Sequence, residues 1–298
     1  MDNLTHALIG VTAGRAAAGT VRREPVWWAF LLGSELPDID ALYALQGRSG
    51  YLLNHRGWTH SLPGLLLLSA AAALLIFSLG RGGAKYKSIM MYTLSAALIH
   101  VLIDVLTSWG TCLFKPFYAG WLSLDVLPMV DPFILLVLFA GLLAGRRRLP
   151  EKRAAKLALA AVAIFIAARG GLHLAALNTV AHDGRLLAMP TMNPLKWRVV
   201  AEQSWGFETG NLDLLGMRLV KTAEINTGGF SAAGDLTLDP DLDKALGFFR
   251  VPVFTIVERE EKKLLVVKDI SFERGIREVI FEAKGPAAPG TWYKAVRK

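Results

Sequence analysis

The sequence predicts an α-helical membrane bundle followed by a soluble, mainly β domain. Of the 298 residues, 53% are hydrophobic and only 19% are charged, whereas charged residues make up about a quarter of ordinary soluble domains. Long apolar runs fill the first 180 residues, and clusters of basic residues separate these runs. From about Asp183 the sequence becomes more polar, and apolar residues begin to alternate with polar ones as they do in strands.

Two short apolar segments open the chain. Residues 3–19 predict a helix rich in small residues, in which Gly10 and Gly14 form a G-x-x-x-G pair that lets helices approach closely. Residues 26–36 predict a second helix, and Pro37 ends it. Because this second segment is too short for a comfortable independent span, we expect it to tilt or to pack inside the bundle.

Four longer apolar segments follow and complete the predicted bundle. The clearest membrane span covers residues 62–79, and three further spans are expected at 88–109, 126–144 and 157–180. The first domain, residues 1–182, should therefore contain about five to six membrane-embedded helices.

Residues 183–298 predict a soluble β-rich domain of mainly antiparallel strands. Alternating apolar residues indicate strands at 251–257, 264–270, 277–281 and 291–296. We also expect a short helix near Asp239 to Phe249.

The basic residues predict how the chain crosses the membrane. The formal net charge is +8, but the basic residues cluster in loops around 22–23, 81–87 and 146–156, so they are better explained as topology signals than as a nucleic-acid surface. We therefore expect no nucleic-acid partner. With these loops cytoplasmic, the polar motifs and residues 183–298 should lie on the extracytoplasmic side.

Two histidines in the segment from Asn54 to Ser61 provide the first sign of a metal site. His55 and His60 are five residues apart and immediately precede the span at 62–79. Imidazole is the commonest protein ligand for transition metals. The alternative is a pair of interfacial histidines at a helix start.

Further candidate ligands occur at helix spacing and at a helix end. His100 and Asp104 are four residues apart, so both side chains project from one face of a predicted span. Ionisable residues inside a span are costly and usually functional, although a buried His–Asp hydrogen bond between helices is the alternative. Asp38 and Asp40 follow Pro37 and offer two carboxylates, or caps for the helix end.

The remaining ionisable residues have less distinctive positions. His6 lies near the start of the first helix and is either a ligand or a packed histidine. We expect Asp131 to be a turn or cap residue, and His173 and His182 to be structural. Glu35 either orients a ligand or acts as a base.

Together these residues predict a metal site without sulfur ligands. The candidate ligands are His6, Asp38, Asp40, His55, His60, His100 and Asp104. Cys112 is the only cysteine, which excludes an internal disulfide and a thiolate cage. Nitrogen and oxygen ligands suit one or two divalent ions, Zn²⁺ first, with Mn²⁺ or Fe²⁺ as alternatives. Such a site lowers the pKa of bound water and stabilises charge on a phosphoryl or acyl oxygen.

The same motifs resemble the YdjM/YbcI-like family. They are Met1-Asp2-x-x-Thr5-His6, Pro37-Asp38-x-Asp40, His55-Arg56-Gly57-x-Thr59-His60-Ser61 and His100-x-x-x-Asp104. The family is described as inner-membrane metal-dependent hydrolases, and some members are called LexA-binding or LexA-regulated. The resemblance implies a bacterial inner (cytoplasmic) membrane and the ligands His6, Asp38, His55, His60, His100 and Asp104, with Asp40 behind them.

We therefore expect a membrane-embedded metal-dependent hydrolase that acts on a phospholipid or lipid-linked phosphoester. Asp40 or Glu35 would act as base, and Arg56 would neutralise developing charge on the phosphate. The alternative is a membrane regulatory or scaffold protein with a structural metal and a partner-binding C-terminal domain. A metal or proton transporter is a third possibility, but the candidate residues gather near one face and do not line a path through the bilayer.

Overall fold

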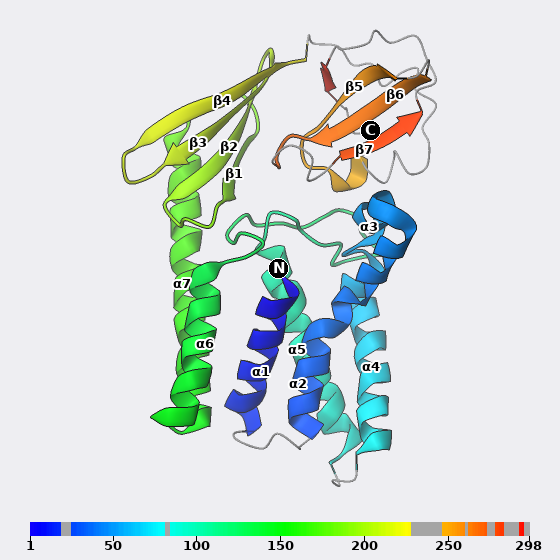
Figure 1. Cartoon of the computed structure of the whole chain (residues 1–298), viewed down its shortest axis with the longest axis vertical. Helices are drawn as coiled ribbons and strands as arrows, with labels where there is room; N and C mark the ends of the chain where they lie inside the picture. The colour runs from blue at the N-terminus through cyan, green and yellow to red at the C-terminus, as the bar shows by residue number, and fades with distance from the viewer. Residues whose placement is uncertain are drawn as a thin grey trace. The chain divides into compact units, whose positions relative to one another are not determined.

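The chain folds into two compact units in this computed structural model (Figure 1). The described residues are 1–18, 25–80, 84–227, 246–259, 262–272, 278–282 and 292–294. The first unit comprises Met1–Leu45 and Asn54–Gly171, and the second comprises Gln46–Leu53 and Leu172–Lys298.

The first unit is built from helices, as the sequence predicts. Its α-helices are α1 (Asn3–Ala18), α2 (Pro25–Glu35), α4 (Leu62–Leu79), α5 (Tyr86–Val105), α6 (Pro132–Arg147) and most of α7 (Glu151–Thr179). Two 3₁₀ helices, η1 (Leu36–Gln46) and η2 (Trp58–His60), lie at the end of the bundle where α2 ends and α4 begins. Helix α2 packs against both α1 and α5, and α5 also packs against α4.

Three described helices, α4, α5 and α7, are long and apolar enough to cross a membrane. The prediction of about five to six membrane-embedded helices is therefore too high as a number of membrane spans. Helix α1 has 16 residues and α2 has 11, so they extend about 24 Å and about 17 Å, less than the roughly 30 Å hydrocarbon core. Helix α6 also has only 16 residues.

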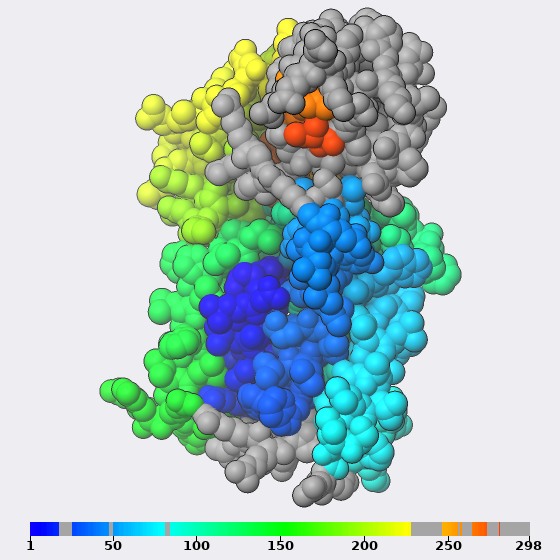
Figure 2. Space-filling model, turned by 45° about the vertical axis from the view of Figure 1, so that its right-hand side comes forward, coloured from blue at the N-terminus to red at the C-terminus, as the bar shows by residue number. Residues whose placement is uncertain are grey.

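The surface of the first unit suits a lipid environment. Helix α4 contributes many exposed apolar side chains, and it lies at the surface in the view of Figure 2. These side chains are Leu62, Leu66, Leu67, Leu74, Leu75, Phe77 and Leu79. In contrast, His60, His100 and Asp104 are almost completely buried. An apolar exterior around buried ionisable groups is the arrangement expected in a bilayer.

The observed helix ends differ from the predicted ends where side chains cap them. Helix α4 has the predicted bounds, and the Ser61 hydroxyl caps it by accepting a hydrogen bond from the backbone N–H of Gly64 at 3.2 Å. Helix α6 begins at Pro132 and not at 126, because the Asp131 carboxylate accepts the N–H groups of Phe133 and Ile134. The expectation that Asp131 is a cap is confirmed.

Helix α5 ends at Val105, four residues before the predicted end at 109. Asp104 therefore lies in the last turn of the helix, and His100 lies one turn earlier. Thr107, two residues after the end of the helix, forms an isolated bridge with Leu127. The candidate ligands on this helix are thus closer to its end than the sequence suggests.

Small residues bring α1, α2 and α5 close together. A Cβ atom on Gly10 of α1 would lie 2.2 Å from the Ser34 hydroxyl oxygen of α2. A Cβ atom on Gly33 of α2 would lie 2.4 Å from the carbonyl oxygen of Thr93 in α5. The close packing predicted from Gly10 is confirmed, and it brings the ends of the three helices into contact range.

The second unit contains two four-stranded antiparallel sheets. The first has the order β1-β2-β3-β4 and consists of Leu186–Pro190, Lys196–Gln203, Gly206–Asp213 and Arg218–Asn226. The second has the order β7-β6-β5-β8, with β5 at Pro252–Arg259, β6 at Lys262–Asp269, β7 at Glu278–Glu282 and β8 at Trp292–Lys294. The antiparallel β region is confirmed.

A shared core and a short helix complete the second unit. Val200 and Phe207 of the first sheet pack with Val253 of the second in one hydrophobic cluster. The short helix α3 (Gly47–Asn54) supplies most of this unit's remaining segment. The helix predicted near Asp239 to Phe249 lies mostly outside the described residues.

Candidate metal centre

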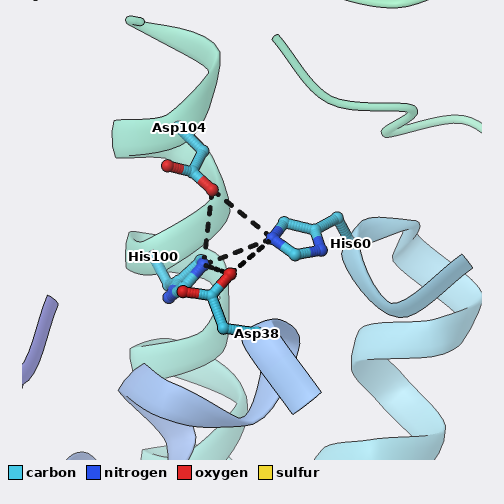
Figure 3. A group of neighbouring side chains, drawn as sticks. All are labelled: Asp38, His60, His100 and Asp104. Carbon is cyan, nitrogen blue, oxygen red and sulfur yellow. Dashed lines mark hydrogen bonds and ion pairs between the residues drawn. The ribbon is translucent and has the colours of Figure 1, made fainter. Parts of the chain in front are cut away.

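Four buried side chains converge at one end of the first unit. Asp38 comes from η1, His60 from η2, and both His100 and Asp104 from α5, and Figure 3 shows all four pointing toward one another. His60 Nε2 lies 3.4 Å from Asp38 Oδ1 and 3.4 Å from Asp104 Oδ2. His100 Nε2 lies 3.6 Å from Asp38 Oδ1, 3.4 Å from Asp104 Oδ2 and 3.3 Å from His60 Nε2.

These separations match a tetrahedral ion site. Metal–ligand bonds of about 2.0–2.1 Å in a tetrahedral zinc site place the donor atoms about 3.3–3.4 Å apart. The five separations given above range from 3.3 to 3.6 Å. All four donor atoms lie within 4.8 Å of one another, so the group could hold one divalent cation.

The hydrogen bonding of the two carboxylates supports the same conclusion. Asp38 Oδ1 and Asp104 Oδ2 point into the group and have no hydrogen-bond partner among the described residues. Their other oxygens are bonded, since Asp38 Oδ2 accepts from Asn3 Nδ2 at 3.1 Å and Asp104 Oδ1 pairs with Arg56. A buried polar atom without a partner costs about 1–3 kcal/mol, and more when it is charged. A cation bound between the two oxygens would remove that cost.

Hydrogen bonds to the far sides of the imidazoles fix the ring orientations. His100 Nδ1 lies 2.6 Å from the backbone carbonyl of Ser34. A carbonyl only accepts, so Nδ1 carries a proton, and Nε2 is the ring nitrogen that faces the donor group. His60 Nδ1 faces Asp40 Oδ2 at 3.4 Å and the Thr59 hydroxyl at 3.0 Å. Both rings thus present Nε2 to the same point.

Both carboxylate oxygens of Asp40 take part in hydrogen bonds, and these bonds orient the neighbouring side chains. Asp40 Oδ1 lies 2.6 Å from His55 Nδ1, and Oδ2 accepts from the Arg56 backbone N–H at 2.8 Å and the Thr59 hydroxyl at 2.5 Å. Burial alone would raise the pKa of Asp40, but the hydrogen bonds from His55 and His60 lower it. This geometry favours a supporting carboxylate over the expected general base.

Arg56 is buried at the centre of a second network. Its Nη2 lies 3.0 Å from Asp104 Oδ1, and its Nη1 donates to Thr107 Oγ1 at 3.2 Å. Its backbone φ of 62° lies in the left-handed region, which costs about 1 kcal/mol for a side-chain-bearing residue. The backbone bonds to Asp40 and from Cys112 hold it there. The guanidinium expected to face phosphate therefore positions Asp104 in this structure.

The other two predicted ligands, His6 and His55, lie beside the four-residue group. The His6 ring stacks on His100 with ring centroids 3.6 Å apart, and its Nε2 lies 3.3 Å from Asp104 Oδ1. His6 Nε2 has no hydrogen-bond partner among the described residues. His55 forms a second possible metal-holding group with Asp38 and Asp40.

The buried carboxylates give the site an excess of negative charge. The site contains three carboxylates, those of Asp38, Asp40 and Asp104. They outnumber its two basic groups, the Arg56 guanidinium and the amino group of Met1, which both pair with Asp104. Burial lowers the pKa of His60, but its contacts with the three carboxylates outweigh burial and raise the pKa to about 9. The carboxylates therefore require extra positive charge, which either a proton or a metal ion can supply.

Glu35 lies at the end of α2, outside both metal-holding groups. Burial raises its pKa to about 7, although the charge of nearby His100 acts in the opposite direction. A carboxyl group that titrates near neutrality can both accept and donate a proton. This pKa is compatible with the role of base that was predicted for Glu35.

Three supporting residues were not predicted from the sequence. Asn3 holds Asp38, the Ser34 carbonyl holds His100, and Thr107 holds Arg56. Asn3 lies three residues before His6, which could have drawn attention to it. A backbone carbonyl carries no sequence signal, because every residue has one.

The two remaining histidines, which were expected to be structural, lie outside both metal-holding groups of the described residues. In the second unit, the His173 ring stacks on Trp197 with ring centroids 5.4 Å apart. His182 Nδ1 lies 3.1 Å from the carbonyl oxygen of Val180.

Comparison with known proteins places these motifs in a family. Residues 1–175 match the YdjM inner membrane protein family. The chain is also 34% identical over 141 residues to the uncharacterized protein YfhP of Bacillus subtilis (strain 168), a match that covers 45% of this chain and 43% of that relative. The alignment thus spans less than half of the relative's length. No solved structure matches the chain.

Proposed function

The chain belongs to the YdjM inner membrane protein family, and from this premise and the site geometry we propose that it is a membrane-embedded metal-dependent hydrolase. One observation carries the proposal. Four buried donor atoms lie within 4.8 Å of one another, and the two carboxylate oxygens among them have no hydrogen-bond partner among the described residues.

The ligands, Arg56 and Glu35 would each have a separate role in hydrolysis. Asp38, His60, His100 and Asp104 would hold the cation, and a bound divalent cation activates water and stabilises charge on a phosphoryl oxygen. Arg56 would keep Asp104 Oδ2 directed at the cation by pairing with Oδ1. Glu35 would take up the proton that the attacking water releases, since its pKa of about 7 suits that transfer.

A phospholipid or lipid-linked phosphoester is the substrate class that we propose. Asp104 lies in the last turn of α5, which is long and apolar enough to span a membrane. Lipid phosphates concentrate beyond the ends of membrane spans, in the headgroup layer. By charge bias, this end of the bundle would face the extracytoplasmic side.

A hydrolysis assay on reconstituted protein tests the proposal. Full-length protein would be placed in phosphatidylcholine and phosphatidylglycerol vesicles, and released phosphate and headgroup would be measured with Zn²⁺ or Mn²⁺ present. We expect hydrolysis that His100→Ala abolishes and that His182→Ala, an exposed histidine in the second unit, leaves intact. Equal turnover by wild type and His100→Ala would contradict the proposal.

One feature favours a second candidate, a regulatory or scaffold protein with a structural metal. All four donor residues are buried, and a closed set of four protein ligands is typical of structural sites, whereas catalytic sites keep an open position. The spectrum of Co²⁺-substituted protein separates the two. A change on adding inorganic phosphate would indicate an open position, and an unchanged spectrum would favour the structural role.

A further inference from the structure

The first sheet of the second unit packs against the end of a membrane-length helix. Leu172, Ala176 and Val180, from the end of α7 and the residue after it, share a hydrophobic core with Trp197 and Leu212 of the sheet. Helix α7 has 29 residues and qualifies as a membrane span. At 1.5 Å per residue it is about 43 Å long, about 13 Å more than the hydrocarbon core. Its ends therefore reach the headgroup layers.

One end of this sheet points back along α7 toward the membrane. Strand β1 begins at Leu186, seven residues after α7 ends at Thr179, and Trp197 at the start of β2 stacks on His173 within α7. His173 lies six residues before the end of α7 at Thr179. The β1–β2 turn at 191–195 therefore lies farther from that end of the helix than the start of β1 does. In an antiparallel meander the β3–β4 turn at 214–217 lies at the same end, and the backbone bond from Leu214 to Leu195 joins the two turns.

This end of the sheet exposes large apolar side chains. Met192 is 60% exposed, Leu215 is 82% exposed and Met217 is 67% exposed. Turns in water favour small polar residues, and the β2–β3 turn at the opposite end accordingly carries an exposed Ser204. The two ends of one sheet therefore differ in the surroundings that they suit.

Basic residues flank the exposed apolar side chains. Lys196 at the start of β2 and Arg218 at the start of β4 are both exposed. Asp213 lies opposite both in the strand register, but its Oδ1 accepts the backbone N–H groups of Leu215 at 3.0 Å and Gly216 at 3.4 Å. These bonds tie Asp213 Oδ1 to the turn, and among the described residues no ion pair joins Asp213 to Lys196 or Arg218.

We propose that the sheet end formed by turns 191–195 and 214–217 inserts into the headgroup layer of the bilayer that α7 spans. Met192, Leu215 and Met217 contact the acyl boundary, and Lys196 and Arg218 contact anionic lipid phosphates. Apolar side chains bordered by cations are the pattern of interfacial membrane contacts. This inference is independent of the metal centre.

Fluorescence quenching of single labels tests the insertion. Cys112 is buried, and burial raises its pKa to about 11, so an introduced exposed thiol reacts first. Leu215→Cys and the control Ser204→Cys would each carry a small environment-sensitive dye, in full-length protein reconstituted in phosphatidylcholine and phosphatidylglycerol vesicles. We expect the label at 215 to be quenched several-fold less by iodide and several-fold more by nitroxide-labelled lipid than the label at 204.

Two further measurements distinguish lipid from other partners. Adding Met217→Asp to the labelled Leu215→Cys protein should reduce the lipid quenching several-fold. Equal iodide quenching at 215 and 204 would overturn the proposal. A signal at 215 that changes when labelled protein is diluted with unlabelled protein would also overturn it, because a second copy of the chain would then cover the turn.

Discussion

The two units each bury carboxylates, but they satisfy them in different ways. In the second unit, Asp269 accepts hydrogen bonds from the backbone N–H groups of Arg250, Val251 and Ser271 and from the Ser271 hydroxyl, at 2.5 to 3.1 Å. In the first unit, Asp38 Oδ1 and Asp104 Oδ2 have no such donor among the described residues. Burial of a carboxylate therefore does not by itself indicate a ligand site. The convergence of unsatisfied carboxylate oxygens with imidazole nitrogens does indicate a ligand site.

The largest expected effect comes from substituting one aspartate of each kind, Asp104 in the first unit and Asp269 in the second. Asp104→Asn should abolish stoichiometric metal binding, and loss of the buried pair with Arg56 should also cost about 3–5 kcal/mol of folding stability. Asp269→Ala should lower the free energy of unfolding by about 2–4 kcal/mol, because buried N–H groups lose their acceptor, yet keep the metal. Metal analysis and denaturant unfolding in detergent measure both effects. Loss of the metal in folded Asp269→Ala would contradict this difference between the buried carboxylates of the two units.

A smaller effect is expected where a carboxylate only supports the ligands. Asp40→Asn should weaken metal affinity about 10–100-fold while keeping the stoichiometry, because Asp40 orients His60 from behind. Competition with a chelator of known affinity measures the change, and the exposed Asp183→Asn serves as control. Complete loss of the metal would instead make Asp40 a direct ligand.

Helix spacing provides a third test. Gly33→Ala should push α2 from α5, since its Cβ would lie 2.4 Å from Thr93 O, and such overpacking typically costs about 1–3 kcal/mol. The shift would move the Ser34 carbonyl away from His100 and weaken metal binding. Gly171→Ala in α7, where a new Cβ meets nothing within 4 Å, should leave metal affinity unchanged. Equal metal affinity in both variants would show that the spacing of α2 and α5 does not set the site.

The smallest expected effect concerns a half-buried carboxyl group. Burial raises the pKa of Glu35 from 4.5 to about 7, so the folded state binds this proton more tightly than the unfolded state. Its contribution to stability is therefore complete below about pH 4.5 and is lost as the pH rises through about 7. Glu35→Gln should flatten the pH dependence of thermal unfolding in this range. An unchanged slope in the variant would assign the dependence to another group.

Much of the fold could be predicted from the sequence, because apolar runs and alternation report burial directly. The bounds of α4 and the strands β5 and β6 follow these patterns. The ends of α5 and α6 do not, since capping by Asp131 and the bridge at Thr107 depend on contacts rather than hydropathy. The expected number of spans was wrong in part because α6 begins only at Pro132 and has 16 residues, whereas the apolar run predicted a span over 126–144.

The convergence of the polar residues was also predictable, from charge bias and helix alternation. His60, His100, Asp38 and Asp104 do meet at one end of the bundle. The resemblance already implied that Asp40 lies behind the ligands, but the division between these four residues and His6 and His55 was not predictable. It depends on ring orientations that the Ser34 carbonyl and Thr59 set, and on an Arg56 side chain that pairs with Asp104.

The central claim is that Asp38, His60, His100 and Asp104 hold one divalent ion. Metal analysis of detergent-purified protein, prepared without chelator and compared with the His60→Ala/His100→Ala and His182→Ala variants, tests it most directly. We expect a bound transition metal in the wild type and in His182→Ala, and its loss in the double variant. Absence of metal in the wild type, with none taken up on adding Zn²⁺ or Mn²⁺, would contradict the claim.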